Sequence, residues 1–149
     1  MEKLSSIFQR TCGAPIEMDG RTIIQIFQMN LSSGQKDFLV RRLNASLQPV
    51  AGLRIKAVKG KIEINGQSHS EVILWADTSP DVVSFSVFSK LGCDLKVWNV
   101  WRSGNLVQAW VGNAGLIVTE NKNSVKLECS GGDENVDFCA LVVQIDYLE

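Results

Sequence analysis

Residues 95–111, LKVWNVWRSGNLVQAWV, carry three of the four tryptophans of the 149-residue chain and form the strongest hairpin pattern in it. Two alternating runs flank Ser103-Gly104-Asn105, a short gap that contains a glycine. Alternation across such a gap is typical of an antiparallel β-hairpin. The stretch therefore predicts two paired strands joined by a tight turn.

Two registers fit this hairpin, and they place the tryptophans differently. A three-residue loop at 103–105 sets Trp98 directly opposite Trp110, with the polar side chains of Lys96, Arg102 and Gln108 around the pair. A two-residue turn at 104–105 shifts the pairing by one residue and moves Trp98 to the face of a different set of side chains. We prefer the three-residue loop because it keeps Lys96 and Arg102 out of the core, where an unpaired charge costs several kcal/mol.

From residue 53 onward, nearly all of the chain consists of short apolar segments separated by turn residues. Asn65-Gly66 is a strong signal for a two-residue hairpin because both residues accept a positive φ. Val83, Phe85 and Val87 alternate with serines, which predicts a strand with one buried face. About nine or ten such strands at roughly ten-residue spacing indicate a mainly β fold, an antiparallel β-sandwich or jelly roll.

We expect a single domain of residues 1–149, in which residues 1–50 pack on the strands of residues 51–149. Residues 22–29 are rich in β-branched side chains and predict a strand. Residues 32–35 have the form of a capping box, and Leu39, Val40, Leu43 and Leu47 follow at helical spacing before Pro49. The pattern predicts one short helix between Ser32 and Pro49, with a strand over 37–42 as the alternative.

The charge and hydropathy of the chain argue against several classes of partner. The formal net charge is −1, so no global field favours nucleic acid or an anionic membrane. The first eight residues lack the apolar core of a secretory signal, and no run approaches the ~20 apolar residues of a membrane helix. We therefore expect a cytoplasmic protein.

The four cysteines lack the spacing of a zinc site or a CxxC motif, and the sequence predicts no cofactor. We expect reduced, mostly buried thiols. Cys129 and Cys139 are the one pair whose spacing suggests a bridge across a hairpin, and only an oxidising compartment would preserve it. Lys56, Lys59 and Lys61 form a modest basic strip, whose expected role is to keep an edge strand from pairing with a neighbour.

Three roles remain open for the Trp98–Trp110 pair. It is a second small core if the helix or the N-terminal segment covers it. It is a subunit interface of a homo-oligomer if its Trp and Arg side chains meet another copy, because both types are enriched at interface centres. In its residue pattern the hairpin resembles the binding faces of carbohydrate-binding β-sandwich modules, which implies tryptophans stacked on a sugar ring and polar side chains bonded to its hydroxyls.

Candidates for chemistry are few. His69 is the one histidine and is expected on the surface; a catalytic role would require Asp77 or Asp81 as its orienting carboxylate. The same two aspartates are the candidates for a glycoside hydrolase pair. The loop carboxylates of Asp133, Glu134 and Asp137 are oxygen ligands suited to calcium, although they lack EF-hand spacing and a solvated loop is expected.

The sequence thus predicts a non-catalytic binding or assembly domain. Its surface centres on Trp98 and Trp110, with Lys96, Arg102 and Gln108 as polar partners. The alternatives are a carbohydrate-active hydrolase that uses the loop carboxylates and a purely structural homo-oligomer.

Overall fold

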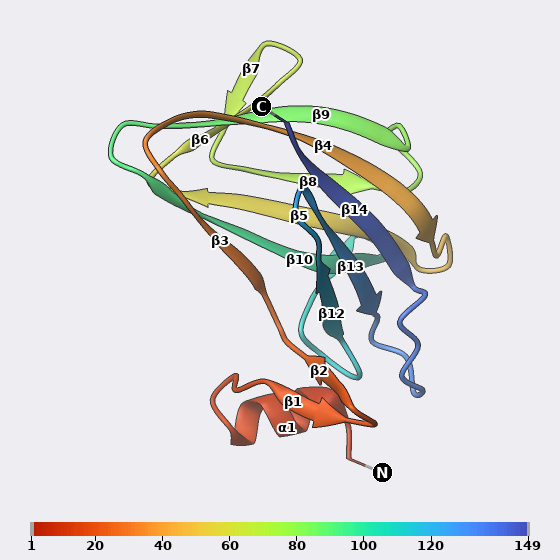
Figure 1. The fold of residues 1–149 in the computed structure, drawn as a ribbon. Helices are drawn as coiled ribbons and strands as arrows, with labels where there is room; N and C mark the ends of the chain where they lie inside the picture. Colours follow the sequence, from red (N-terminus) through yellow and green to blue (C-terminus); the bar gives the residue numbers. More distant parts are fainter. Residues whose placement is uncertain (1, 149) are drawn as a thin grey trace.

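The computed structural model describes residues 2–148 and contains two antiparallel sheets that face each other across one core (Figure 1). The strands are β1 (Ile16–Met18), β2 (Arg21–Ile23), β3 (Phe27–Leu31), β4 (Gly34–Ala45), β5 (Val50–Val58), β6 (Lys61–Ile64), β7 (Gln67–His69), β8 (Glu71–Trp75), β9 (Val82–Ser89), β10 (Cys93–Ser103), β11 (Leu106–Gln108), β12 (Gly115–Glu120), β13 (Ser124–Ser130) and β14 (Leu141–Leu148). The antiparallel β-sandwich expected from the sequence is confirmed.

The larger sheet has seven strands in the order β12-β13-β14-β4-β9-β6-β7. The smaller sheet has the order β11-β10-β5-β8, with β3 paired to β10 as its fifth strand. Strands β1 and β2 form a separate two-stranded sheet. The chain has more strands than the sequence predicted because several, such as β7 and β11, are only three residues long.

The core lies between the two large sheets and is built from alternate residues of their strands. In β9, Phe85 and Val87 are buried, as their alternation with serines predicted. Phe38 of β4 lies directly opposite Phe85, and the two rings stack with their centroids 5.1 Å apart. Ile55 of β5 and Leu95 of β10 close the core from the smaller sheet.

The helix predicted between Ser32 and Pro49 is wrong, because most of that stretch is β4. Phe38 and Val40 alternate into the core, whereas Leu43 and Leu47, which the helical pattern would bury, are 53% and 60% exposed. Strand β4 pairs with β14 on one side and β9 on the other, so its backbone hydrogen bonds are made within the sheet. The alternative strand over 37–42 lies inside β4.

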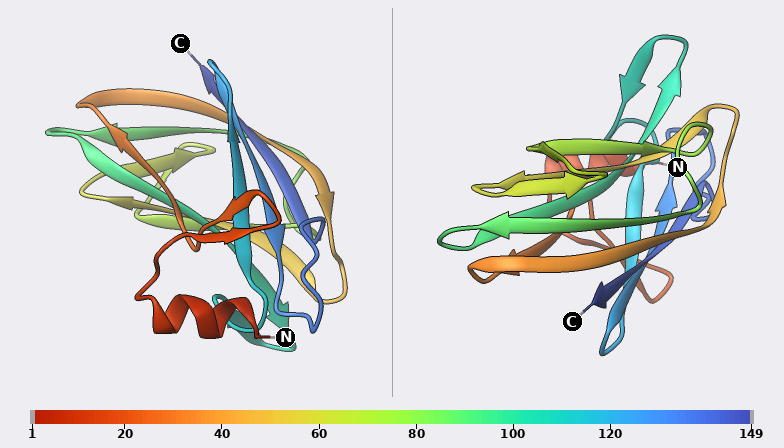
Figure 2. Two further views of the ribbon diagram at one scale, coloured as in Figure 1. Left: turned by 60° about the horizontal axis from the view of Figure 1, so that its bottom comes forward. Right: turned by 90° about the horizontal axis from the view of Figure 1, so that it is seen from above.

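The helix of the described chain is instead α1 (Leu4–Arg10), which packs with β1 and β2 next to β12 (Figure 1; Figure 2, left). Leu4, Phe8, Ile23 and Ile117 form a second apolar cluster there. The amide of Leu4 donates to Oδ1 of Asn113 at 3.1 Å, which fixes the start of the helix. The predicted strand over residues 22–29 is divided between β2 and β3.

No helix within residues 2–148 has the length and apolar character needed to span a membrane. At one end of the sandwich, four connections cross from one sheet to the other: β3 to β4, β5 to β6, β7 to β8, and β9 to β10. The β10–β11 hairpin projects beyond the rest of the smaller sheet (Figure 2, right).

Candidate functional site

Strands β10 and β11 form the expected hairpin, but its turn has two residues. Arg102 pairs with Val107, and Trp101 pairs with Gln108. The three-residue loop that we preferred is therefore wrong, and the alternative register is correct. The charge argument fails because Arg102 and Val107 both lie on the outer face of the sheet, so this register buries no arginine in the core.

The side chains of Trp98 and Trp110 nevertheless stack, with ring centroids 5.0 Å apart and an interplanar angle of 29°. The ladder ends before Trp110, so the backbone neighbour of Trp98 is Arg54 on β5. Trp110 adopts a φ of +59°, a conformation rare for a bulky residue. Trp98 is 6% exposed and Trp110 is 40% exposed, so the outer ring of the stack is the accessible one.

Alternate residues of β10 point away from the core. Leu95 belongs to the core, so Lys96, Trp98 and Arg102 share the outer face of the smaller sheet. The structure therefore places Lys96 and Arg102 on the face of the stacked tryptophans, as the sequence predicted. The N-terminal segment packs next to β12 and forms its own cluster, which does not include these tryptophans.

Gln108 does not share that face. It lies opposite Trp101, and the indole N–H of Trp101 donates to Oε1 of Gln108 at 3.0 Å. The side chains of a directly opposed cross-strand pair lie on the same side of the ladder, so Gln108 shares the side of Trp101. Successive residues of a strand alternate, so Arg102 lies on the opposite side. Gln108 is a partner of the buried Trp101 and not of the Trp98–Trp110 stack.

Trp75 of β8 belongs to this face, although the sequence analysis did not single it out. It pairs with Gly52 of β5, and a Cβ at Gly52 would come within 2.7 Å of the Trp75 ring. The indole therefore lies against the glycine backbone. The Arg102 guanidinium lies 4.6 Å from the ring centroid of Trp75 and forms an ion pair with Asp77. The sequence signal for this placement of Trp75 is a glycine opposite a tryptophan, but it can be recognised only when the pairing of β5 with β8 is known.

A second arrangement of the same kind lies beside the first. The Arg54 guanidinium is 5.7 Å from the ring centroid of Trp98, and its Nε donates to Oε2 of Glu71 at 2.9 Å. In both arrangements a carboxylate orients an arginine over an indole, which is a favourable cation–π geometry. We call the set of Arg54, Trp75, Trp98, Arg102 and Trp110 the Arg–Trp face.

Exposed apolar side chains continue from this face along the second arm of the hairpin. Leu106 is 66% exposed, Val107 47% and Val111 49%. Together with Trp110 they give four exposed large apolar residues within residues 106–111. We call this segment the apolar arm.

The structure does not bring the hydrolase candidates into one hydrogen-bonded group within residues 2–148. Asp81 pairs with Arg42 at 3.0 Å, and the same guanidinium donates to the carbonyl of Ser79 at 2.6 Å. These contacts hold the β8–β9 loop against β4. Asp77 is engaged by Arg102 on the smaller sheet, whereas His69 lies on β7, an edge strand of the larger sheet.

The calcium candidates lie in the connection between β13 and β14. The amide of Asn113 donates to the carbonyls of Asp133 and Glu134, both at 2.8 Å, and the carboxylate of Asp137 accepts the backbone N–H of Cys139. Across residues 2–148 no three His, Cys, Asp or Glu side chains gather in a way that could hold a metal ion. The contacts of this loop fix its own backbone.

The cysteines are all free in the structure, so Cys129 and Cys139 form no bridge. Cys93 and Cys129 are buried, and Cys12 and Cys139 are exposed. Burial raises the pKa of the Cys129 thiol well above its ordinary value. Burial also raises the pKa of Cys93.

Comparison with known proteins finds no match: no protein-family model and no curated protein matches the sequence, and no solved structure matches the fold.

Proposed function

We propose that the protein is a non-catalytic binding or assembly domain that recognises another protein surface through the Arg–Trp face and the apolar arm. The observation that carries this proposal is the continuity of the two. Val107 lies opposite Arg102 on the outer face, and the exposed Trp110, three residues later, stacks on Trp98. Interface centres are enriched in tryptophan and arginine, and a few such residues supply most of the binding energy.

The Arg–Trp face is organised before any partner binds. Arg54 and Arg102 each hold a carboxylate and lie over an indole, so their side chains have lost much of their rotational freedom. Binding through such side chains avoids an ordering cost of roughly 0.5–1.5 kcal/mol for each. Single exposed apolar residues are normal on protein surfaces, whereas several in one short segment beside stacked tryptophans support a docking role.

The geometry favours a protein partner over a sugar. The two indoles stack on each other, and Trp98 is almost completely buried under Trp110 and Arg54. The Gln108 amide oxygen is bonded to Trp101. A sugar would therefore meet one partly exposed indole, whereas a protein surface would cover both that ring and the apolar arm.

A second copy of the chain is the first partner to test. We expect sedimentation velocity to show reversible association whose extent rises with protein concentration. The change Trp110→Ala should weaken the association, because it removes the outer ring of the stack and part of the exposed apolar surface. Leu43→Ala is the matched control, since Leu43 is also exposed but lies on β4 in the other sheet.

A monomeric wild type at every accessible concentration, or equal association of both variants, would reject self-association through this face. Titration calorimetry with simple sugars tests the carbohydrate alternative, which predicts binding that disappears in Trp110→Ala. The loop carboxylates of the hydrolase alternative are held in ion pairs with Arg42 and Arg102, which weighs against an enzyme.

A further inference from the structure

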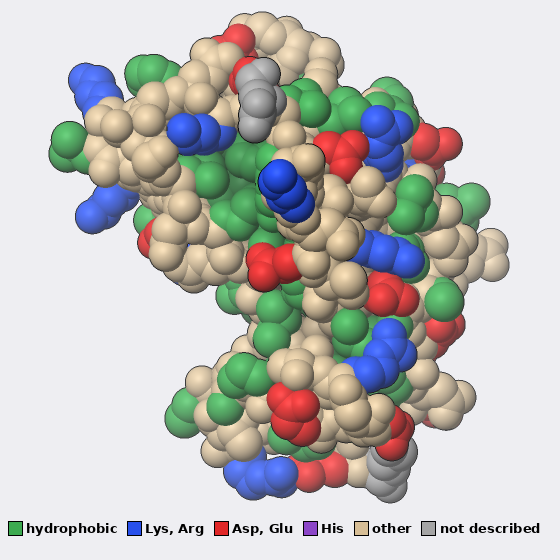
Figure 3. All heavy atoms as spheres, in the orientation of Figure 1, with side chains coloured by type: hydrophobic (Ala, Val, Ile, Leu, Met, Phe, Trp, Pro, Cys, Tyr) green, Lys and Arg blue, Asp and Glu red, His purple; other side chains and the backbone are tan. Residues whose placement is uncertain are grey.

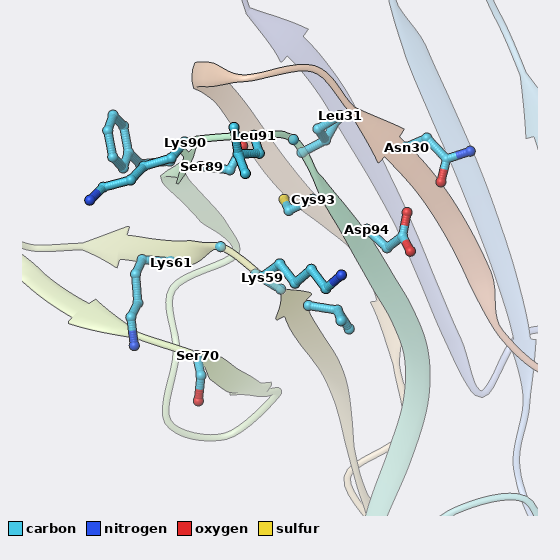
Figure 4. Close-up of a pocket in the computed structure, with 15 residues that line it drawn as sticks. Asn30, Leu31, Lys59, Lys61, Ser70, Ser89, Lys90, Leu91, Cys93 and Asp94 are labelled. Atoms are coloured by element: carbon cyan, nitrogen blue, oxygen red, sulfur yellow. The ribbon is translucent and has the colours of Figure 1, made fainter.

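A groove of about 880 Å³ opens at the end of the sandwich where the four connections cross between the sheets (Figure 4). Asn30 and Leu31 line it from the end of β3, Lys59 and Gly60 from the β5–β6 turn, and the β9–β10 turn closes the third side. The volume lies within the usual range for small-ligand sites, about 300–1,000 Å³. Loops at the end of a β-sandwich are a common place for such sites.

The groove carries an excess of positive charge. Lys59 lines it from the β5–β6 turn, Lys61 from the start of β6 and Lys90 from the β9–β10 turn, against the single carboxylate of Asp94. None of these lysines forms an ion pair within residues 2–148. Figure 4 shows Lys61 and Lys90 to one side of Cys93 and Lys59 below it, with the amino ends of the three lysines pointing in different directions. Of the three lysines of the predicted basic strip, Lys59 and Lys61 line the groove, whereas Lys56 lies on the outer face of β5.

Apolar side chains accompany the lysines. Phe88 and Leu91 line the groove and are 52% and 97% exposed, although both are large apolar residues. Leu31 adds a half-buried apolar side chain on the facing edge. In Figure 3 basic and apolar side chains project together at the end of the sandwich that holds the β9–β10 turn. Exposure of this apolar surface to water is unfavourable, and a ligand with an apolar part would remove it from water.

Two residues of the β5–β6 turn have backbone features that bear on the groove. A Cβ at Gly60 would lie 2.9 Å from Sγ of Cys93, so any other residue at this position would push into the groove. Lys59 adopts a φ of +67°, a region in which glycine is the unstrained residue.

We infer that this groove binds a small amphiphilic anion, a molecule with a carboxylate, sulfonate or phosphate group next to an apolar chain or ring. Lys59, Lys61 and Lys90 surround the groove with positive charge, which attracts and holds the anionic group. Leu31, Phe88 and Leu91 cover the apolar part. The site is separate from the Arg–Trp face and does not depend on the function proposed for that face.

Titration calorimetry with three probes tests the inference on the full chain. Dodecanoate carries both features of the expected ligand and should bind. Dodecyltrimethylammonium has the same tail with the opposite charge, and inorganic phosphate has charge without a tail; both should bind at least roughly tenfold more weakly, the effect of losing one charge-assisted contact. Equal binding of the cationic probe would overturn the proposal, as would the failure of dodecanoate to bind.

Variants assign the binding to the groove. Lys61→Gln with Lys90→Gln should weaken dodecanoate binding roughly tenfold, by the same reasoning. Lys122→Gln with Lys126→Gln removes equal charge from β13 and the turn before it and should leave binding unchanged. Equal loss in both double variants would show a non-specific charge effect and reject the site. Loss of binding in Trp110→Ala, with the groove intact, would assign the ligand to the Arg–Trp face instead.

Lys59→Gly separates binding from folding. Glycine relieves the positive φ at this position, so the variant should keep or raise the unfolding temperature of the protein. Dodecanoate binding should nevertheless weaken, because one ammonium group is lost. Retained binding in a stable Lys59→Gly protein would contradict the role given to Lys59.

Discussion

The guanidinium of Arg102 covers the indole of Trp75, with its central carbon 4.6 Å from the ring centroid. The two residues come from strands that are not neighbours: Arg102 lies on β10, Trp75 lies on β8, and β5 runs between them. Val100 of β10 and Trp75 both pair with Gly52 on β5, and the missing side chain there leaves room for the indole to reach toward Arg102.

Replacing Arg102 with Ala should therefore expose Trp75 without unfolding the protein. A partly exposed cation–π contact contributes about 0.5–1 kcal/mol, and the ion pair with Asp77 adds little at the surface. Acrylamide quenching should increase because one face of the Trp75 ring becomes open to solvent. Arg102→Lys is the control that keeps the charge and loses the planar group. Unchanged quenching in Arg102→Ala would mean that Trp75 is not covered in solution.

Gly52→Ala should be destabilising although alanine is the smallest change available. The new Cβ would lie 2.7 Å from the ring of Trp75 and 3.1 Å from Cγ2 of Ile73, so the indole must move. Overpacking of this kind costs about 1–3 kcal/mol. Urea denaturation measures the cost. Gly131→Ala is the matched control, because its Cβ would meet only Ala140 at 3.8 Å, an ordinary contact.

The contrast between Phe38 and Leu43 tests the assignment of β4. Phe38 is 3% exposed and stacks on Phe85, so Phe38→Ala should cost about 3–5 kcal/mol of unfolding free energy. Leu43 is 53% exposed, and Leu43→Ala should change stability by only about 0.5 kcal/mol. A helix over this stretch would bury Leu43 and give a large cost. Denaturant unfolding of the two variants distinguishes these outcomes.

This segment shows what the sequence could and could not predict. Phe85 and Val87 alternate with serines, and the alternation alone gave the correct strand and its buried face. In β4 the apolar residues fit both a helical and a strand spacing, and pairing with β14 and β9 settled the matter. Local pattern predicts an element only where a single period fits it, since neighbouring strands otherwise determine the outcome.

The candidate site was predictable to a similar degree. The stack of Trp98 on Trp110 was expected, but it arises from a positive φ at Trp110 and not from direct cross-strand pairing. Arg54 and Trp75 were missed because their places depend on pairing between distant strands. The groove at Lys59 and Lys90 could not be predicted for the same reason, because only the crossing of the chain between the sheets brings the β5–β6 and β9–β10 turns together.

Ionisation of the Cys129 thiol in the unfolded chain should lower the stability of the protein in alkaline solution. Burial raises its pKa in the folded state, whereas the unfolded thiol keeps an ordinary pKa near ~8.5. The unfolded chain thus loses a proton that the folded chain retains, so stability is fully present below that value and falls as the pH rises above it. Urea denaturation at neutral and alkaline pH should show the fall, and Cys129→Ala should reduce it while lowering stability at neutral pH. Cys139→Ser is the control, because it removes an exposed thiol in place of the buried one. An equal alkaline loss in wild type and Cys129→Ala would assign the effect to other groups.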